Sequence, residues 1–322
     1  MSAGPGRIEA IDQYRGIAII LMVIANHLAD IVTIPPWLKH ARDVGLTPVD
    51  LIAPFFIFAI ALTFGPSYRR RVGQGGMGRA WGHFLRRFLA IIGIGAIISA
   101  GEILVGENAS GIGWGVLQAI GVAGILTLPT LALKPVWRAL AGLLLLGLYQ
   151  VLLAAFWLSS VLRSPHGGLQ GALAWGSMLI IATAVSDLWH VRPNGKRLFA
   201  LASLVALAVG IALSFLVPVS KNRVSASYVL ISLGASGLLF ACVWLLVERL
   251  RVRPALFAWW GANPLLLYVG HYLLLGIFVL PGIPWWHAKA PVWLAAAQAV
   301  FLLGALSVFA WLLARRDRRI SL

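Results

Sequence analysis

The sequence has few charged residues and almost no cysteine. Charged side chains make up only 11% of the 322 residues, whereas hydrophobic ones make up 60%, and the mean hydropathy is +0.90. A water-soluble domain of this length could not hide so much apolar surface. The single cysteine, Cys242, lies within an apolar run, which excludes a disulfide framework and a cysteine metal site. The composition therefore indicates an integral membrane protein.

Long apolar runs are abundant where charge is scarce. A helix needs about 20 apolar residues to cross roughly 30 Å of hydrocarbon, whereas a transmembrane strand needs only about 10 alternating ones. Ten runs have the length of helices, and they are centred on residues 15–33, 48–66, 88–106, 113–133, 138–158, 168–188, 197–217, 224–247, 254–280 and 292–314. We expect an all-α polytopic bundle of about ten transmembrane helices. Because the connections are short, residues 1–322 are predicted to form a single membrane domain.

Acidic residues are also scarce, with ten Asp and Glu against 26 Lys and Arg, for a formal net charge of +16. Such an excess can indicate nucleic-acid binding, but here the basic residues collect at alternate ends of the apolar runs, so no nucleic-acid partner is predicted. If both termini are cytoplasmic, 20 basic residues face the cytoplasm. Six face outwards, namely Lys39, Arg42, Arg163, Lys221, Arg223 and Lys289. This bias follows the positive-inside rule and supports an even number of spans.

Polar residues inside or beside the apolar runs gather mostly in the outer half of the predicted bundle. They are Asn26, His27, His40, Asp50, Glu102, Gln118, Lys221, Asn222, Asn263 and His271. Because polar and ionisable groups are costly in a membrane, their convergence indicates an active site. Each also has a purely structural interpretation. A His or Asn can hydrogen-bond a neighbouring helix, and Asp50 can be a first-turn residue favoured by the helix dipole. Pro264 should bend the ninth run.

Five motifs, in order, resemble one known family. Residues 7–18, followed by Asn26, by Lys39-His40-Ala41 and by residues 45–51, resemble the start of the catalytic domain of heparan-α-glucosaminide N-acetyltransferase and its bacterial relatives. Three later segments agree in order, namely residues 115–118, residues 218–222 with Ser225, Ser227 and Tyr228, and Asn263 with residues 268–271. The resemblance therefore extends over nearly the whole chain.

The resemblance implies an enzyme that takes acetyl-CoA from the cytosol and passes its acetyl group to an amino sugar across the membrane. His40 matches the family's catalytic histidine, Asn26 its active-site asparagine and Asp50 its acidic partner. These residue types suit the chemistry: histidine is a base near neutral pH, a carboxylate can fix its tautomer, and an asparagine can donate to an oxyanion. Whether His40 carries the acyl group itself stays open. The residues expected to contact the substrate are Glu102, Gln118, Lys221, Asn222, Asn263 and His271.

Coenzyme A is a cytosolic polyanion, so its phosphates call for positive charge on the inner face. The candidates are Arg69, Arg70, Arg71, Arg86 and Arg87, although the positive-inside rule explains these residues as well. No metal is expected. The resemblance also suggests a homodimer in a bacterial inner membrane, with the active site toward the periplasm.

Two departures from the family limit what carries over. Ala119 follows Gln118 where the family often has Arg, and only residues 159–168 separate the fifth and sixth runs, where larger members carry a long insertion. The choice of acceptor is therefore the least transferable property. One alternative is a transporter of sugars or lipid-linked glycans, although no inverted pair of interrupted helices is apparent. Another is a non-catalytic sensor or assembly subunit.

Overall fold

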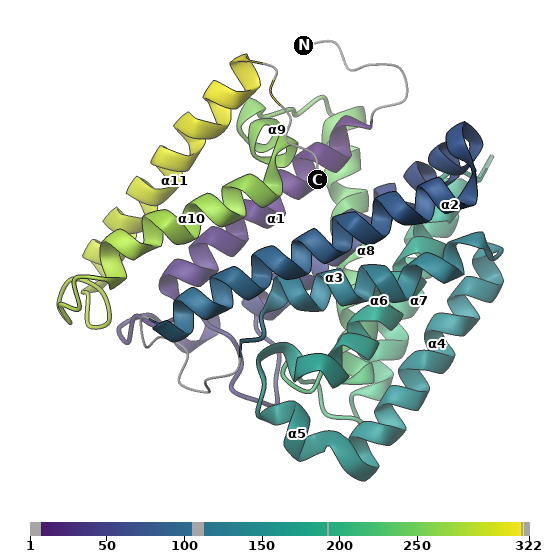
Figure 1. The fold of residues 1–322 in the computed structure, drawn as a ribbon, viewed down its shortest axis with the longest axis horizontal. Coiled ribbons are helices and arrows are strands. Elements are labelled where there is room, and N and C mark those ends of the chain that lie inside the picture. Colours follow the sequence, from purple (N-terminus) through teal and green to yellow (C-terminus); the bar gives the residue numbers. More distant parts are fainter. Residues whose placement is uncertain (1–7, 105–112, 192, 317, 319–322) are drawn as a thin grey trace. The chain divides into compact units, whose positions relative to one another are not determined.

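The computed structural model describes residues 8–104, 113–191, 193–316 and 318, and every regular element in these ranges is helical (Figure 1). The helices are α1 Glu9–Leu28, α2 Ile52–Leu104, α3 Val116–Thr127, α4 Pro135–Leu152, α5 Leu158–Leu162, α6 Gly168–Leu188, α7 Gly195–Leu213, α8 Ala226–Trp244, α9 Ala255–Ala262, α10 Pro264–Val279 and α11 Val292–Arg315. Short 3₁₀ or π turns include η1 Pro36–Leu38 and η2 Pro48–Leu51 before α2, and η3 Leu128–Ala132 after α3. The expected all-α class is confirmed. The basic residues Arg7, Arg192 and Arg319, and the end of the predicted span at 105–106, lie outside the described residues.

The apolar helices make this an integral membrane protein, but they do not establish how often the chain crosses the bilayer. Six described helical runs are long and apolar enough to span, or seven if α9 and α10, bent by 90°, count as one. The run Pro48–Leu104 counts once although it holds two of the predicted spans, and Val116–Ala132 is shorter than the others. Helix coincides with each of the ten predicted runs. The number ten stays a prediction.

Helix α2 is two helices joined at Gly76. This residue has a φ of +78°, which glycine adopts without steric cost. The ring of Phe64 lies 4.9 Å from that of Phe84 and 5.2 Å from that of Phe88, so the two halves run back against each other. The predicted connection between these spans, residues 65–87, is therefore mostly helical rather than a loop. Its Arg-rich turns can remain helical beyond the apolar part because basic side chains are good helix formers.

Contacts divide the chain into two compact units. The first comprises residues 1–41, 47–56 and 239–322, and the second comprises residues 42–46 and 57–238. In the first unit, α1 packs closely against α9 (Figure 1). The approach requires two glycines: a Cβ at Gly16 would lie 1.9 Å from the carbonyl oxygen of Phe257, and one at Gly261 would lie 1.9 Å from that of Asp12. Small residues at membrane helix interfaces allow this kind of backbone contact.

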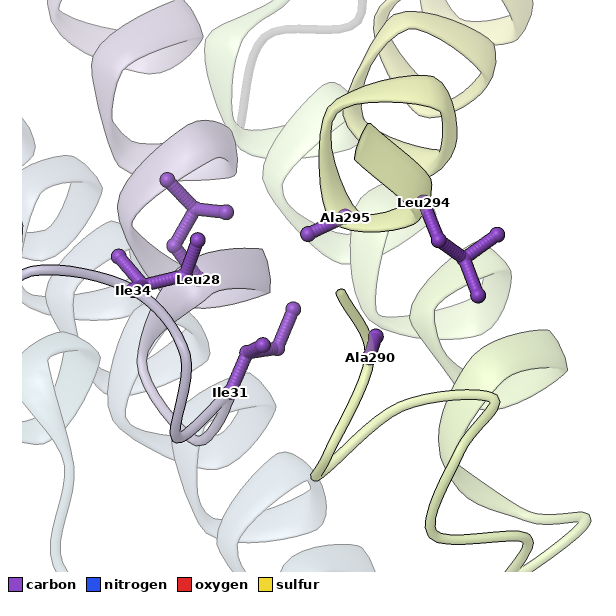
Figure 2. Close-up of a cluster of buried hydrophobic side chains, with 6 residues drawn as sticks. All are labelled: Leu28, Ile31, Ile34, Ala290, Leu294 and Ala295. Atoms are coloured by element: carbon purple, nitrogen blue, oxygen red, sulfur yellow. The ribbon is translucent and has the colours of Figure 1, made fainter. Parts of the chain in front are cut away.

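The end of α1 is fastened to the start of α11 by an apolar cluster. Figure 2 shows its six side chains, which come from the end of α1, the segment after it, and the first residues around α11: Leu28, Ile31, Ile34, Ala290, Leu294 and Ala295. A backbone hydrogen bond of 2.9 Å from Val32 to Ala288 lies beside it. The cluster therefore fixes the chain segment that leads from α1 towards His40.

In the second unit, α6 is the central helix and packs against both α3 and α4. Its large buried side chain Trp175 meets the buried Tyr228 of α8 edge to face at 5.8 Å. Gly142 of α4 lies close to Ile181 of α6, where a Cβ would come within 2.6 Å of the isoleucine side chain. The unit is thus held by helix packing with small residues at the crossings.

Candidate active site

The local sequence Thr47-Pro48-Val49-Asp50 builds the acidic half of the site. Thr47 is the N-cap of η2, proline takes the first helical position, and Asp50 is the third. The Asp50 Oδ2 atom accepts hydrogen bonds from the backbone N–H groups of Thr47 at 2.9 Å and of Ala41 at 3.3 Å. Threonine followed by proline and an acidic third residue is a helix-starting sequence. The structural interpretation of Asp50 as a first-turn residue is therefore correct.

The second oxygen of the same carboxylate holds His40. The His40 Nδ1 atom lies 2.8 Å from Asp50 Oδ1. A carboxylate only accepts, so Nδ1 carries the hydrogen and the lone pair of the neutral ring is on Nε2. The Asp50 side chain is 0% exposed whereas that of His40 is 40% exposed. A buried anion thus orients a half-exposed imidazole, which is the arrangement expected of a general base.

Asn26 and His271 form a second pair in the same unit, 245 residues apart in sequence. His271 is fully buried on α10 and its Nδ1–H donates to the carbonyl of Tyr268 in its own helix. Its Nε2 therefore accepts from the Nδ2 of Asn26, at 3.0 Å. This contact ties α1 to α10, as the structural interpretation of a membrane asparagine predicts. The Asn26 amide nitrogen has a second N–H that can serve a substrate.

The other predicted substrate residues have varied contacts. Gln118 is buried: its Oε1 accepts from Gly115 N at 3.0 Å, and its Nε2 donates to Ser99 Oγ at 3.2 Å, so it caps α3 and joins it to α2. Asn263 lies at the bend between α9 and α10 and donates to the carbonyl of Arg318 at 3.1 Å. Glu102 lies near the end of α2 and is partly exposed. Their predicted contact with substrate stays a prediction.

Lys221 and Asn222 belong to a segment that is hydrogen-bonded to residues 42–45, in the loop after His40. Lys221 is buried, and Asn222 Nδ2 donates to the carbonyl of Arg42. The Nε of Arg223 donates to Asp43 Oδ1 at 2.9 Å, and Ser220 Oγ donates to the same oxygen at 3.0 Å. A hydrogen bond of 2.8 Å joins Gly45 N to the carbonyl of Val219. The Arg223 guanidinium lowers the pKa of the Asp43 carboxyl below its ordinary value.

Asp43 and Arg223 were not predicted as site residues, although both lie in loops assigned to the outer face. The one indication in the sequence is that the two loops, assigned to the same side of the membrane, carry opposite charges. No local pattern links the two residues, because they are 180 positions apart in the chain.

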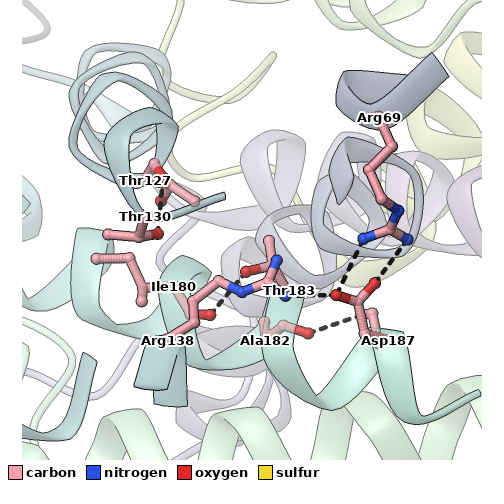
Figure 3. A network of polar contacts seen from close by, with 9 residues as sticks. Arg69, Thr127, Thr130, Arg138, Ile180, Ala182, Thr183 and Asp187 are labelled. Atoms are coloured by element: carbon pink, nitrogen blue, oxygen red, sulfur yellow. Dashed lines mark hydrogen bonds and ion pairs between the residues drawn. The ribbon is translucent and has the colours of Figure 1, made fainter. Parts of the chain in front are cut away.

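Among the predicted coenzyme A arginines, Arg69 has a strong protein partner. Its guanidinium donates two hydrogen bonds to Asp187, at 2.9 and 3.1 Å, while half of its side chain stays exposed (Figure 3). Arg138, which is almost fully buried, donates to the same carboxylate. The guanidinium of Arg71 lies 5.9 Å above the ring of Phe84, and Arg86 donates to the carbonyl of Gly82. Asp187, which pairs with both of these arginines, was not predicted from the sequence as a site residue.

The fold and site define the class of an all-helical integral membrane protein that carries a carboxylate-oriented histidine. The family model described as heparan-alpha-glucosaminide N-acetyltransferase, catalytic, matches residues 7–167, half of the chain, and the chain belongs to this family. The human heparan-alpha-glucosaminide N-acetyltransferase is 34% identical over 146 residues, which is 42% of this chain and 21% of the human protein. The match thus spans about a fifth of the human protein's length.

The family prediction is confirmed, and membership supports a transferase of the acetyltransferase class. The matched range contains Asn26, His40, Asp50 and the predicted arginines. The later motifs around Lys221, Asn263 and His271 lie beyond it and rest on the resemblance alone.

Proposed function

We propose that this protein is a transmembrane N-acetyltransferase of a bacterial inner membrane. It takes the acetyl group of cytosolic acetyl-CoA and transfers it to an amino sugar or related glycan group on the outer face. The observation that carries the proposal is the bond between the buried Asp50 carboxylate and the half-exposed His40 ring, 2.8 Å long, in the matched part of the chain. A helix can cross a membrane without a histidine held against a buried carboxylate.

The pair suits attack by an amine on a thioester. His40 Nε2 takes a proton from the acceptor ammonium, and Asp50 stabilises the imidazolium that results. The amine nitrogen then bonds to the acetyl carbon and gives up a second proton. The carbon–sulfur bond breaks, and the coenzyme A thiolate that leaves takes up that proton. An N–H of Asn26 is the candidate donor to the oxyanion, an interaction worth about 3 kcal/mol in enzymes that use one. An acyl-histidine route uses the same atoms in two steps.

The arginines on both sides of Gly76 are the proposed site for the phosphates of coenzyme A. Arg69, Arg70, Arg71, Arg86 and Arg87 lie on α2 within two to three turns of this reversal. Arginine recognises phosphate through paired N–H donors. The Asp187 carboxylate occupies two donors of Arg69, so this residue has fewer donors left for a phosphate.

The test is release of coenzyme A from acetyl-CoA by the purified protein in liposomes with an amino sugar acceptor. We expect His40→Ala to abolish release at unchanged expression. His190→Ala is the matched control, because it removes an exposed imidazole in the turn after α6. Undiminished activity of His40→Ala would remove His40 from the mechanism. Absence of thioester cleavage by the wild type, together with sugar uptake, would favour the transporter alternative.

Asp50→Asn tests the carboxylate separately. Asparagine can still accept a hydrogen bond from His40, but it has no charge to stabilise an imidazolium. We expect the rate to fall roughly a hundred- to ten-thousandfold, the usual contribution of a positioned base. Helix content, followed by circular dichroism, should stay close to that of the wild type. If Asp50→Asn retains the full rate, the Asp50 carboxylate serves only to stabilise the start of the helix and the loop before it.

A further inference from the structure

Three buried polar side chains lie together in the first unit and have no part in the proposed reaction. His27 is in the last turn of α1, His287 is in the connection between α10 and α11, and Gln298 is in the second turn of α11. They are 0%, 8% and 3% exposed, respectively. Buried polar groups of this kind are nearly always hydrogen-bonded through each of their polar atoms.

The hydrogen bonds that these side chains do make determine which atoms remain. His27 Nε2 lies 3.2 Å from the carbonyl oxygen of Ala295, which can only accept, so Nε2 carries the hydrogen. His287 is hydrogen-bonded to the backbone of His27. Gln298 donates through Nε2 to the carbonyl of Trp286 at 2.6 Å. In each side chain the donor is therefore engaged with a backbone carbonyl.

The remaining atoms are all acceptors. His27 Nδ1, His287 Nε2 and Gln298 Oε1 are buried and have no hydrogen-bond partner among the described residues. Leaving such an atom unpaired is unfavourable, because on burial it loses the hydrogen bond that it makes to water in the unfolded chain. All three present lone pairs, so a cation bound among them would satisfy them together.

The two rings are close enough to share one ion. Their centroids are 6.0 Å apart, so a zinc ion with nitrogen bonds of about 2.0–2.1 Å would reach both rings after a small side-chain rotation. Histidines that bind metal almost always donate their other N–H to a carboxylate or backbone carbonyl, as His27 does. The ring centroid of Phe278 lies 5.5 Å from that of His27, in an edge-to-face arrangement.

We propose that His27, His287 and Gln298 form a binding site for a divalent transition-metal ion, with Zn²⁺ the best match. Imidazole nitrogen is a preferred ligand of zinc, nickel and copper, and an amide oxygen can complete the set with water. Asp30, in the turn after α1, adds a negative charge that acts on His287.

The site has only two side chains of the usual metal-binding types, His, Cys, Asp and Glu. No group of three or more His, Cys, Asp and Glu in the described ranges is placed to hold a metal. Here an amide supplies the third atom, and His27 and His287 come from opposite ends of the chain. The sequence prediction of no metal rested largely on the lack of cysteine. With only two strong ligands, the ion should exchange with solvent metal rather than stay permanently bound.

The experiment uses the full chain, purified in detergent with a tag that lacks histidine and stripped with EDTA. Equilibrium dialysis with ZnCl₂ and elemental analysis should find one ion per chain, and a Co²⁺ complex should give a d–d absorption spectrum. His27→Gln and His287→Ala should each abolish that stoichiometric binding. The control variants His83→Ala and His190→Ala remove histidines of the other unit and should bind as the wild type does.

A second measurement keeps the test independent of variant folding. Zn²⁺ should raise the melting temperature of the wild type and of the controls, but not that of His287→Ala, because binding to the folded state stabilises it. If the wild type and both site variants bind Zn²⁺ equally, the ion is bound by surface histidines and the proposal is overturned. The proposal is also overturned if the wild type shows no stoichiometric binding. These readouts do not involve acetyl transfer, so they stand or fall separately from the proposed function.

Discussion

The carboxylate of Asp50 does two things at once. One oxygen accepts from the backbone of Thr47 and Ala41 and so secures the start of η2 and the loop before it, while the other orients His40. The structural interpretation of this residue is therefore correct, and the geometry leaves the proposed catalytic role open to it as well. A single buried anion couples the position of the His40 ring to the start of a membrane helix.

The residues differ in how far sequence could place them. His40 and Asp50 are ten residues apart and joined by a helix-starting sequence, so their pairing could be predicted. Asn26 and His271 were assigned to one site by resemblance, but their direct hydrogen bond depends on how α1 packs against α10. No local pattern contains that information.

The Asp43–Arg223 pair should respond to acid. The pKa of Asp43 is below the ordinary 3.8, chiefly through its hydrogen bond to Arg223. Its contribution to stability is therefore complete above that value and is lost as the pH falls through the lower folded pKa. Because both side chains are partly exposed, the contribution should not exceed about 1 kcal/mol. Melting of the wild type and of Asp43→Asn, compared from pH 7 into acid below pH 3.8, should show a small gap that narrows as the pH falls. A gap that does not narrow below pH 3.8 would assign it to something other than this charge.

At the scale of elements, glycine and charge determine which helices meet. Sequence predicted the positions of the apolar runs and the bend at Pro264, and α9 and α10 do diverge by 90° there. It did not predict that the Arg-rich residues 65–87 are helical up to a single break at Gly76. Many glycines lie in this sequence, and only the packed structure shows which of them are in contact.

Gly16 provides a test of the α1–α9 crossing. In Gly16→Ala the new Cβ would lie 1.9 Å from the Phe257 carbonyl oxygen, a backbone atom that cannot turn aside. We expect the two helices to be pushed apart at a cost of about 1–3 kcal/mol, seen as a lower melting temperature in detergent. Gly304→Ala in α11 is the matched control, since nothing lies within 4 Å of its added Cβ. Equal melting temperatures of the two variants would contradict the packing.

Asp187 should matter more to stability than either of its arginines. In Asp187→Ala the almost fully buried Arg138 loses its partner, whereas the half-exposed Arg69 returns to water (Figure 3). Removing one partner of a buried ion pair costs about 3–5 kcal/mol. Loss of monodisperse protein in size-exclusion chromatography is the readout. Arg69→Gln is the control and should behave nearly as the wild type, because Arg138 keeps its carboxylate; a larger loss in Arg69→Gln than in Asp187→Ala would refute this ranking.

At the scale of the whole molecule, the helices are established. Which of their ends face the cytoplasm is predicted only from the distribution of basic residues. The positive-inside bias predicts an even number of spans. That prediction depends on α9 and α10 together crossing the membrane once, because a bent pair can also enter and leave on the same side. The two possibilities place everything after α10 on opposite faces.

Cysteine labelling separates the two topologies. In a Cys242→Ser background the chain has no other cysteine, so a single added thiol reports one position. Arg163→Cys, before α6, and Lys289→Cys, after α10, should both react with an impermeant maleimide in intact spheroplasts, because α6, α7, α8 and the bent pair make four crossings between them. Arg197→Cys, after α6, should react only in permeabilised cells. If residue 163 were labelled from outside and residue 289 only after permeabilisation, the bent pair would be a re-entrant segment and the count would be odd. Asn263, at the bend, would then lie at the tip of that segment rather than within a span, which is a position where an unwound backbone can meet a substrate.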